Sequence, residues 1–278
     1  MDNFAPYGAR SAAMTAKPAR VLVIAGSDSG GGAGIQADIK TITMLGGHAM
    51  TAVTAVTAQN TTGVTAVHPV PAEVILAQID AVVEDIGVDA VKIGMIGSVF
   101  AARQIALRLE RLKAENPDLP IVFDPVMVAT SGSSLADEAT IAAFGPLMDL
   151  ATITTPNLPE LARLSNKEDP VAAALGLVGE HGCAVLIKGG HGEGSESIDY
   201  LFGGSGTIAL AAPRLATENT HGTGCTLSSA IAAGLAKGHE IEAAVRDAKA
   251  FVSAAIAAAD RLEVGQGHGP LHHFYRFY

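Results

Sequence analysis

The chain alternates between short runs rich in β-branched residues and longer segments in which apolar residues recur at helical spacing. This alternation is typical of a mostly parallel sheet that helices cover on both faces. The expected strands are residues 20–25, 50–57, 90–93, 120–123, 151–154 and 184–187. Two further runs, 199–202 and 207–210, flank a glycine-rich turn and are expected to form a hairpin at one edge of the sheet.

Helices are expected between these strands. One apolar face comprises Ile35, Ile39, Ile42 and Leu45, a second comprises Val74 or Ile75 with Ile79, Val82 and Ile86, and a third helix is expected over residues 241–260. No proline-rich or charge-rich linker divides the 278 residues, so we expect one domain, residues 19–278, after a flexible tail, residues 1–18. The tail lacks the apolar core of a signal peptide.

Charge and composition exclude several classes of protein. Charged residues make up 17% of the chain and apolar residues 49%, as in a globular enzyme with a buried sheet. The formal net charge of −10 argues against nucleic acid or an anionic membrane as a partner, because both attract clustered lysine and arginine. Residues 41–72 carry no formal charge, but polar residues interrupt them too often for a membrane-spanning helix. Cys183 and Cys225 form no metal-binding pair, which favours a reducing cytoplasm.

In open sheets of this kind, ligands bind beyond the carboxyl ends of the strands, and those positions are unusually polar here. The first strand is followed by the loop 26–34, the second by Gln59 and Asn60, the third by Gly94 and Met95, the fourth by Asp124, the fifth by Asn157 and Glu160, and the sixth by Lys188. The 26–34 loop has neither the dinucleotide glycine pattern nor a P-loop ending. We expect it to let the backbone approach a small substrate, and a flexible surface loop is the alternative.

Side chains near the first two strands can contribute to a substrate pocket. Gln36 and Asp38 lie on the first helical turns after the glycine loop and are expected to point into the cleft. Gln59 offers a donor and an acceptor side by side, which matches a ring nitrogen next to an exocyclic amine. The alternative for Gln59 is a side chain that only caps the backbone.

Carboxylates follow two central strands. Asp124 and Glu160 are candidate Mg²⁺ ligands, because this ion takes a few carboxylates together with waters and substrate phosphates. Lys188 can offset phosphate charge, although a lysine at a strand end is often only solvated. No Ser-His-Asp triad with a recognisable local sequence is present, and His272 and His273 are expected to be structural.

Residues 219–226, Asn-Thr-His-Gly-Thr-Gly-Cys-Thr, run directly into an alanine-rich helical pattern. A glycine-rich turn that feeds a helix directs backbone N–H groups and the positive end of the helix dipole at one point, where phosphate can bind. The alternative is that the glycines only form a tight turn. The dipole is expected to lower the pKa of the Cys225 thiol below about 8.5, so that it can accept a proton from a substrate hydroxyl. Alternatively, Cys225 is a small buried residue beside catalytic amides.

Six segments taken together resemble the hydroxymethylpyrimidine/phosphomethylpyrimidine kinases, bifunctional enzymes of thiamine biosynthesis within the ribokinase-like family. The segments are residues 25–40, 58–61, 92–95, 155–160, 188–191 and 219–226. They occur in the family's order, from about Arg20 to the C-terminus. The resemblance implies a three-layer α/β/α fold and phosphorylation of 4-amino-5-hydroxymethyl-2-methylpyrimidine by ATP with Mg²⁺, first to the monophosphate and then to the diphosphate.

The resemblance also implies a role for each matching residue. It places Asp38, Gln59 and Met95 in the pyrimidine pocket, with Gly26 and Ala33 near it. It places Asp124, Asn157 and Glu160 in the metal and phosphate region, with Lys188 beside the nucleotide. The anion hole is formed by Gly222, Thr223, Gly224 and Cys225. Many related sugar kinases place aspartate where this chain has Cys225, which leaves the identity of the base open.

The resemblance further implies a homodimer, and we expect residues 126–134 to form a mobile flap over the ligands. Two alternatives are kept. A pyridoxine or pyridoxal kinase shares much of the glycine loop and the cysteine anion hole. A protein of another class, a non-catalytic vitamin-binding regulator, would keep the pocket without ATP turnover.

Overall fold

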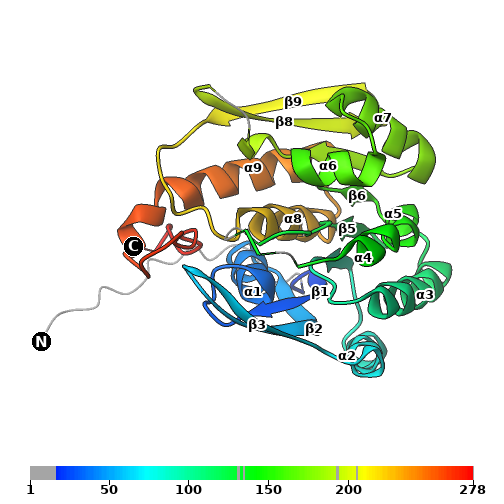
Figure 1. Ribbon diagram of the computed structural model, residues 1–278. Helices are drawn as coiled ribbons and strands as arrows, with labels where there is room; N and C mark the ends of the chain where they lie inside the picture. Colours follow the sequence, from blue (N-terminus) through cyan, green and yellow to red (C-terminus); the bar gives the residue numbers. More distant parts are fainter. Residues whose placement is uncertain (1–16, 130–131, 134, 192–193, 205, 278) are drawn as a thin grey trace, which may run out of the picture.

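The computed structural model describes residues 17–129, 132–133, 135–191, 194–204 and 206–277. The strands of the described chain form one sheet in the order β3-β2-β1-β4-β5-β6-β7-β8-β9 (Figure 1). Their bounds are β1 (Arg20–Asp28), β2 (His48–Asn60), β3 (Gly63–Pro69), β4 (Ala90–Ile93), β5 (Ile121–Phe123), β6 (Ile153–Thr154), β7 (Ala184–Ile187), β8 (Glu196–Gly203) and β9 (Gly206–Pro213).

The helices are α1 (Gly34–Met44), α2 (Ala72–Asp85), α3 (Val99–Glu115), α4 (Glu138–Ala142), α5 (Gly145–Leu150), α6 (Leu158–Ser165), α7 (Pro170–His181), α8 (Thr223–Leu235) and α9 (Ile241–Ala257), with short 3₁₀ turns η1 (Gly189–His191) and η2 (Ala259–Leu262). No helix in these described ranges is both long enough and apolar enough to span a bilayer.

In sheet order, β2, β1, β4, β5, β6 and β7 run parallel to one another. At one edge β3 is antiparallel to β2, and at the other edge β8 is antiparallel to β7 and β9 to β8. All six predicted parallel strands are present, and the predicted edge hairpin lies within β8 and β9. One hairpin was not predicted. β2 runs on to Asn60 and turns into β3, so Gln59 lies inside a strand and not after it. β3 is mostly exposed and lacks a buried apolar face, which is why its sequence carries no clear strand pattern.

Alternate residues of β1 face opposite layers of helices. Leu22 and Ile24 join a core cluster with residues of α2, α3, α5 and α7. Val21 and Val23 join a second cluster with residues of α1, α8 and α9. Because successive side chains of a strand point to opposite faces, the buried run of β1 is apolar throughout. The predicted three-layer arrangement is therefore confirmed, and Figure 1 shows α1, α8 and α9 together on one face.

A C-terminal segment, residues 264–273, links the turn between β2 and β3 to the loop before α8. The backbone N–H groups of Gln266 and Gly267 donate to the Thr61 hydroxyl, each at 3.2 Å. Further along, the His221 N–H donates to the Gly269 carbonyl at 3.0 Å, and His273 is hydrogen-bonded to Thr226 at 2.9 Å. Two distant parts of the chain are thus held by one segment.

Candidate active site

A cavity of about 660 Å³ lies at the carboxyl ends of the parallel strands. One end is lined by the glycine loop 26–34, Gln59 and Met95, the middle by the loop before α8, and the other end by Asp124, Glu160 and Lys188. The predicted site residues that line this cavity are Gly26, Ala33, Gln59, Met95, Asp124, Asn157, Glu160, Lys188, Gly222, Thr223, Gly224 and Cys225. The structure therefore brings together every predicted site residue except Asp38.

The glycine loop is an ordered part of the wall and not a flexible surface loop. Asp28, at the end of β1, accepts hydrogen bonds from the backbone N–H groups of Gly30 at 2.8 Å, Gly32 at 3.0 Å and Ala33 at 2.8 Å. Asp28 as a whole is only 2% exposed. These bonds fold the loop around one buried carboxylate, which holds the backbone of the loop against the cavity.

The loop before α8 forms a nest of backbone amides. Gly222 precedes the first residue of α8 with φ of 83°, and no side chain caps the helix. A Cβ atom on Gly222 would overlap the carbonyl oxygen of Gly32, so the two glycine loops touch at this point. Thr223 is held by a bond from its hydroxyl to the Thr220 carbonyl at 2.6 Å. The first-turn amides of α8 therefore face the cavity, as an anion site requires.

The prediction of a lowered pKa for Cys225 is wrong. Burial raises the pKa of this thiol to about 11, although the Lys92 ammonium opposes the rise. Asp38 and Asp124 add to the rise, because their negative charges disfavour a thiolate. The dipole of α8 alone does not make Cys225 a thiolate at neutral pH.

Asp38 and Gln36 do not point into the cleft as predicted. Asp38 is fully buried, where its carboxylate accepts from Lys92 at 3.0 Å and from the Ser229 hydroxyl at 2.6 Å. Gln36 is turned back to β1, accepting from the Asp28 N–H at 2.9 Å and donating to Ser27 at 2.8 Å. Both side chains lie on the side of α1 that packs on the sheet, because helix rotation is fixed by the apolar face around Ile35 and Ile42.

Lys92 is a cavity residue that the sequence interpretation missed. It lies within β4, lines the cavity and has no exposed surface. Burial lowers the pKa of its ammonium, but the charges of Asp38, Cys225 and Asp124 raise it further, so its pKa lies above the ordinary value. A lysine in an otherwise apolar strand is rarely buried without a partner, and that pattern was the available signal.

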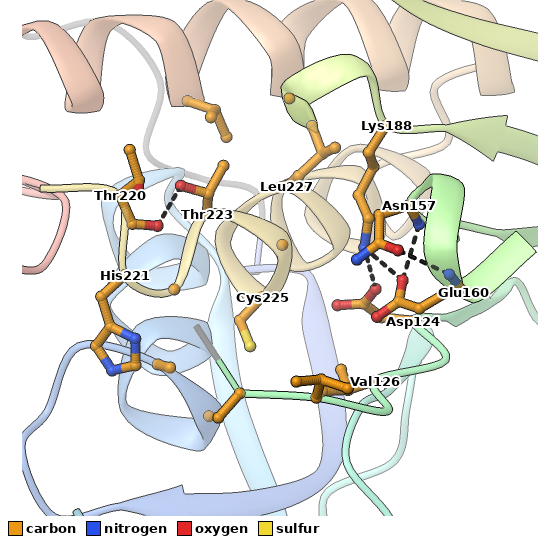
Figure 2. A pocket seen from close by; sticks show the side chains of 18 of the residues that line it. Asp124, Val126, Asn157, Glu160, Lys188, Thr220, His221, Thr223, Cys225 and Leu227 are labelled. Atoms are coloured by element: carbon orange, nitrogen blue, oxygen red, sulfur yellow. Dashed lines mark hydrogen bonds and ion pairs between the residues drawn. The ribbon is translucent and has the colours of Figure 1, made fainter. Parts of the chain in front are cut away.

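Asp124, Lys188 and Glu160 form a cluster at the other end of the cavity (Figure 2). The Lys188 ammonium lies 2.8 Å from Asp124 and 3.5 Å from Glu160. Asp124 is fully buried and also accepts from the hydroxyls of Thr155 and Ser228. Burial lowers the pKa of Lys188, but the two carboxylates raise it further, so that the lysine is charged. Two carboxylates therefore converge on one cation.

Asn157 positions Glu160 through the first turn of α6. The Asn157 side chain accepts from the Glu160 N–H at 2.8 Å, and Glu160 accepts from the Asn157 N–H at 2.8 Å. This reciprocal capping box fixes both side chains at the helix N-terminus. Asn157 thus lines the cavity and holds the carboxylate of its neighbour in place.

Further lining residues were not anticipated. His221 is buried and its Nε2 lies 2.9 Å from Asp28, so it joins the loop before α8 to the 26–34 loop. At the far end of the cavity, Lys249 pairs with Asp199 at 2.9 Å and Arg214 donates to the carbonyls of Gly189 and Gly190. Their partners lie far away in the sequence, so no local pattern marks them.

The expected flap, residues 126–134, is partly described. Val126, Met127, Val128, Ala129 and Gly132 line the cavity, whereas residues 130, 131 and 134 lie outside the described residues. Figure 2 shows Val126 beside Asp124 and facing Cys225. This segment is therefore part of the wall, and its motion remains a prediction.

Comparison with known proteins gives one family. The model of the phosphomethylpyrimidine kinase family matches residues 28–272. A hydroxymethylpyrimidine/phosphomethylpyrimidine kinase of Rhizobium meliloti is 51% identical over 92% of this chain and 97% of its own length. One from Streptomyces coelicolor is 46% identical over 92% of this chain and 94% of its own.

Solved structures share the fold. Bacillus subtilis pyridoxal kinase in an ADP complex matches with a TM-score of 0.84 and 34% identity, over 94% of this chain and all of that one. Phosphomethylpyrimidine kinase from Clostridium difficile matches with a TM-score of 0.73 and 40% identity, over 85% of this chain and 99% of that one. The predicted ribokinase-like fold is confirmed. On this evidence the chain belongs to the phosphomethylpyrimidine kinase family.

Proposed function

We propose that this chain transfers the γ-phosphoryl group of ATP to the hydroxymethyl group of 4-amino-5-hydroxymethyl-2-methylpyrimidine, and then phosphorylates the monophosphate to the diphosphate, in thiamine biosynthesis. Curated relatives that match nearly the whole chain are named as kinases of this kind. The observation that carries the proposal is one cavity lined by Gln59, the amide nest, Asp124 and Lys188. Gln59 lies beside His221, and Figure 2 shows Cys225 of the nest between His221 and the cluster of Asp124 and Lys188. Phosphoryl transfer needs this arrangement of acceptor, anion site and charged nucleotide end.

In the first step, the substrate hydroxyl oxygen bonds to the γ-phosphorus while the bond from that phosphorus to the β,γ-bridging oxygen breaks, releasing ADP. The N–H groups of Gly222 to Cys225 stabilise charge on the equatorial oxygens, and Lys188 offsets charge at the nucleotide end. Most of the catalysis is expected from this alignment and charge stabilisation. The second step differs, because its nucleophile is a phosphate oxygen that is already ionised near neutral pH.

The base for the first step is Cys225 in this proposal. Its sulfur must lose its own proton before it can accept that of the hydroxyl, and a pKa of about 11 leaves it protonated at neutral pH before ligands bind. Lys92 favours the thiolate, because its positive charge opposes the effect of burial. Only a small thiolate fraction therefore acts in the first step, which makes that step sensitive to pH.

The cluster of Asp124, Glu160 and Lys188 fits Mg²⁺ that takes most of its ligands from ATP. Among the described residues, no group of three or more His, Cys, Asp or Glu side chains is arranged to hold a metal ion. Two carboxylates that converge on one ammonium group nevertheless match the few protein ligands that Mg²⁺ uses beside phosphates and water. When bound, the ion would neutralise charge on the phosphates, with Asp124 and Glu160 as its protein ligands.

The function is tested by incubating the protein with ATP, Mg²⁺ and the aminopyrimidine alcohol and measuring the products by mass spectrometry. Successive mono- and diphosphate peaks are expected. A monophosphate without diphosphate would contradict the second step, and no product would contradict the proposal. Asp124→Asn is expected to raise the Mg²⁺ concentration needed for half-maximal rate, whereas Asp118→Asn, a change at an exposed residue outside the cavity, is the matched control.

A pyridoxal kinase is the second candidate, supported by the TM-score of 0.84 with the Bacillus subtilis enzyme. Pyridoxal lacks an exocyclic amine, so one hydrogen bond of Gln59 would be lost, which is expected to cost about 1–3 kcal/mol. Comparing kcat/KM for the two substrates separates the candidates. A higher value for pyridoxal would favour this second function.

We also propose that the protein acts in the cytoplasm as a homodimer in which residues 19–278 form one domain after an N-terminal tail. The family resemblance supports the dimer, and the single continuous sheet supports the single domain. Sedimentation analysis tests the dimer: one species of monomer mass at micromolar concentration would contradict it.

A further inference from the structure

The hydrogen bonds around Gln59 form a chain from β1 to the loop before α8. Its backbone N–H and carbonyl are both bonded to the Ser29 hydroxyl, at 2.8 and 2.7 Å, so the backbone is fixed. In the structure its amide oxygen lies 3.1 Å from Thr57 Oγ1, and its amide nitrogen lies 3.4 Å from His221 Nε2. With the backbone fixed, the side-chain amide has two possible orientations. They are related by a half-turn that exchanges the positions of its oxygen and nitrogen.

His221 can only donate at its Nε2. Burial raises the pKa of the Asp28 carboxyl, but hydrogen bonds from His221 and from the backbone of Ala33 and Gly30 lower it further, so the net pKa lies below its ordinary value. Asp28 is therefore ionised at neutral pH and only accepts. Since His221 Nε2 lies 2.9 Å from this carboxylate, Nε2 carries the proton. It can face the amide oxygen of Gln59 but not its N–H groups.

Thr57 leads to the same orientation from the other side. Its hydroxyl has one hydrogen, and the shorter of its two contacts is to the Ser27 carbonyl at 2.8 Å, which only accepts. That hydrogen cannot also serve the Gln59 oxygen, which lies 3.1 Å away, whereas the hydroxyl oxygen can accept from an amide N–H after a half-turn of the amide. Both neighbours therefore favour the amide turned by this half-turn, with its oxygen on the His221 side and its nitrogen on the Thr57 side.

We propose that His221, held by Asp28, sets the orientation of the Gln59 amide, and that this orientation selects an aminopyrimidine and turns its hydroxymethyl group toward the nest. The inference rests on the proposed function. Gln59 then offers its remaining oxygen lone pair to the exocyclic amine and its remaining N–H to the adjacent ring nitrogen. His221 acts through Gln59 and is a positioning residue.

The direction of the reacting hydroxymethyl group follows from the order of substituents on the pyrimidine ring. The ring carbon that bears the amine lies between the ring nitrogen and the carbon that bears the hydroxymethyl group. With the amine on the His221 side, the hydroxymethyl group extends further in that direction, toward the loop that carries Gly222 and Cys225. Figure 2 shows His221 on this loop, with Cys225 between it and the cluster of Asp124, Glu160 and Lys188. The opposite amide orientation would direct the hydroxyl away from the nest.

The test compares the amino substrate with its oxo analogue, in which a carbonyl replaces the amine and the neighbouring ring nitrogen bears hydrogen. This analogue keeps the nucleophile and reverses the donor and acceptor. The wild-type protein is expected to prefer the amino substrate in kcat/KM by about 100-fold, because the analogue leaves buried groups unpaired. His221→Phe frees the amide to turn, so the preference is expected to fall below about tenfold. His221→Gln, which restores a donor, is expected to recover most of it.

A second variant keeps the inference open to refutation if His221→Phe does not fold, as judged by circular dichroism. Thr57→Val removes the acceptor on the other side and is expected to lower the same preference, whereas Thr65→Val, on exposed β3, is the matched control. Equal losses on both substrates in the His221 variant, or an unchanged ratio in Thr57→Val, would overturn the inference alone. A wild-type protein that phosphorylates neither compound would overturn the proposed function and this inference with it.

Discussion

The Lys92 ammonium lies 3.0 Å from each carboxylate oxygen of Asp38, and neither side chain has any exposed surface. The pair joins β4 to α1, and Ser229 of α8 donates to the same carboxylate. Three elements that line or support the cavity therefore meet at one buried ion pair. Lys92 also places positive charge near Cys225, where the nest opens.

Removing one partner of this pair is expected to lower the free energy of unfolding by about 3–5 kcal/mol, because the other charge is left buried without compensation. Lys92→Met and Asp38→Asn test this by urea denaturation, and the double variant is expected to lose much less than the sum. Strictly additive losses would contradict the pairing. The exposed pair Arg246 and Glu242 is the control, with an expected effect of about 0–1 kcal/mol.

Cys225→Ala is expected to slow the first phosphorylation by about 100-fold and the second by less than about tenfold, because only the first has a hydroxyl proton to remove. Since the pKa of the thiol is raised to about 11, the thiolate fraction grows with pH across the neutral and alkaline range. The wild-type first step is therefore expected to accelerate with rising pH, and the variant to lack this rise. Single-turnover measurements of each step check this.

The opposite result for Cys225 is equally clear. Similar losses in both steps, with parallel pH profiles, would assign the residue to the nest and exclude it as a base. Cys183→Ala is the matched control, since this buried cysteine lies outside the cavity.

Gly222→Ala is expected to abolish both steps, because a Cβ atom would overlap the carbonyl oxygen of Gly32 and separate the two glycine loops. Gly238→Ala is a close control. Gly238 has φ of 82°, against 83° for Gly222, but a Cβ atom there meets nothing within 4 Å. Both variants pay the left-handed strain of about 1–2 kcal/mol, so the difference in activity isolates the contact. Equal activities would show that the loops need not touch.

Stability is expected to fall as the pH is lowered from about 6.5 to about 4. Burial lowers the pKa of His273 to about 4, from an ordinary value of 6.5. Between these values the unfolded chain binds a proton that the folded chain does not, so the free energy of unfolding decreases by up to about 3 kcal/mol. Urea denaturation over this range checks the slope. His273→Gln should flatten it, and an equally steep slope in that variant would assign the effect to other groups.

The sheet could be predicted because its buried strands are rich in β-branched residues and are separated by segments in which apolar residues recur at helical spacing. The cavity residues could be predicted where they follow strands, as Asp124 and Lys188 do, because the carboxyl ends of parallel strands meet at one edge. The β2–β3 hairpin could not, since β3 is exposed and has no apolar alternation. The position of Gln59 in the cavity was nevertheless expected correctly.

The remaining errors concern properties that only tertiary packing sets. Asp38 was assigned to the pocket because it lies on the first helical turns after the glycine loop and because the family resemblance places it there, but the rotation of α1 packs its side chain against Lys92. For Cys225 the helix dipole was a local argument, whereas burial depends on elements from the whole chain. The bond between His221 and Asp28 joins residues 193 positions apart, which no local pattern reports.

The segment 264–273 affects when the protein becomes active during its own translation. It anchors both Thr61 and the loop that carries His221, so these two parts gain their support only after this segment has been translated. A nascent polypeptide that ends before Gly265 can form the central strands, yet it lacks the ties that shape the nest. Catalytic competence is therefore acquired only once this segment has been translated, and products that stalled ribosomes release before it are expected to consume no ATP.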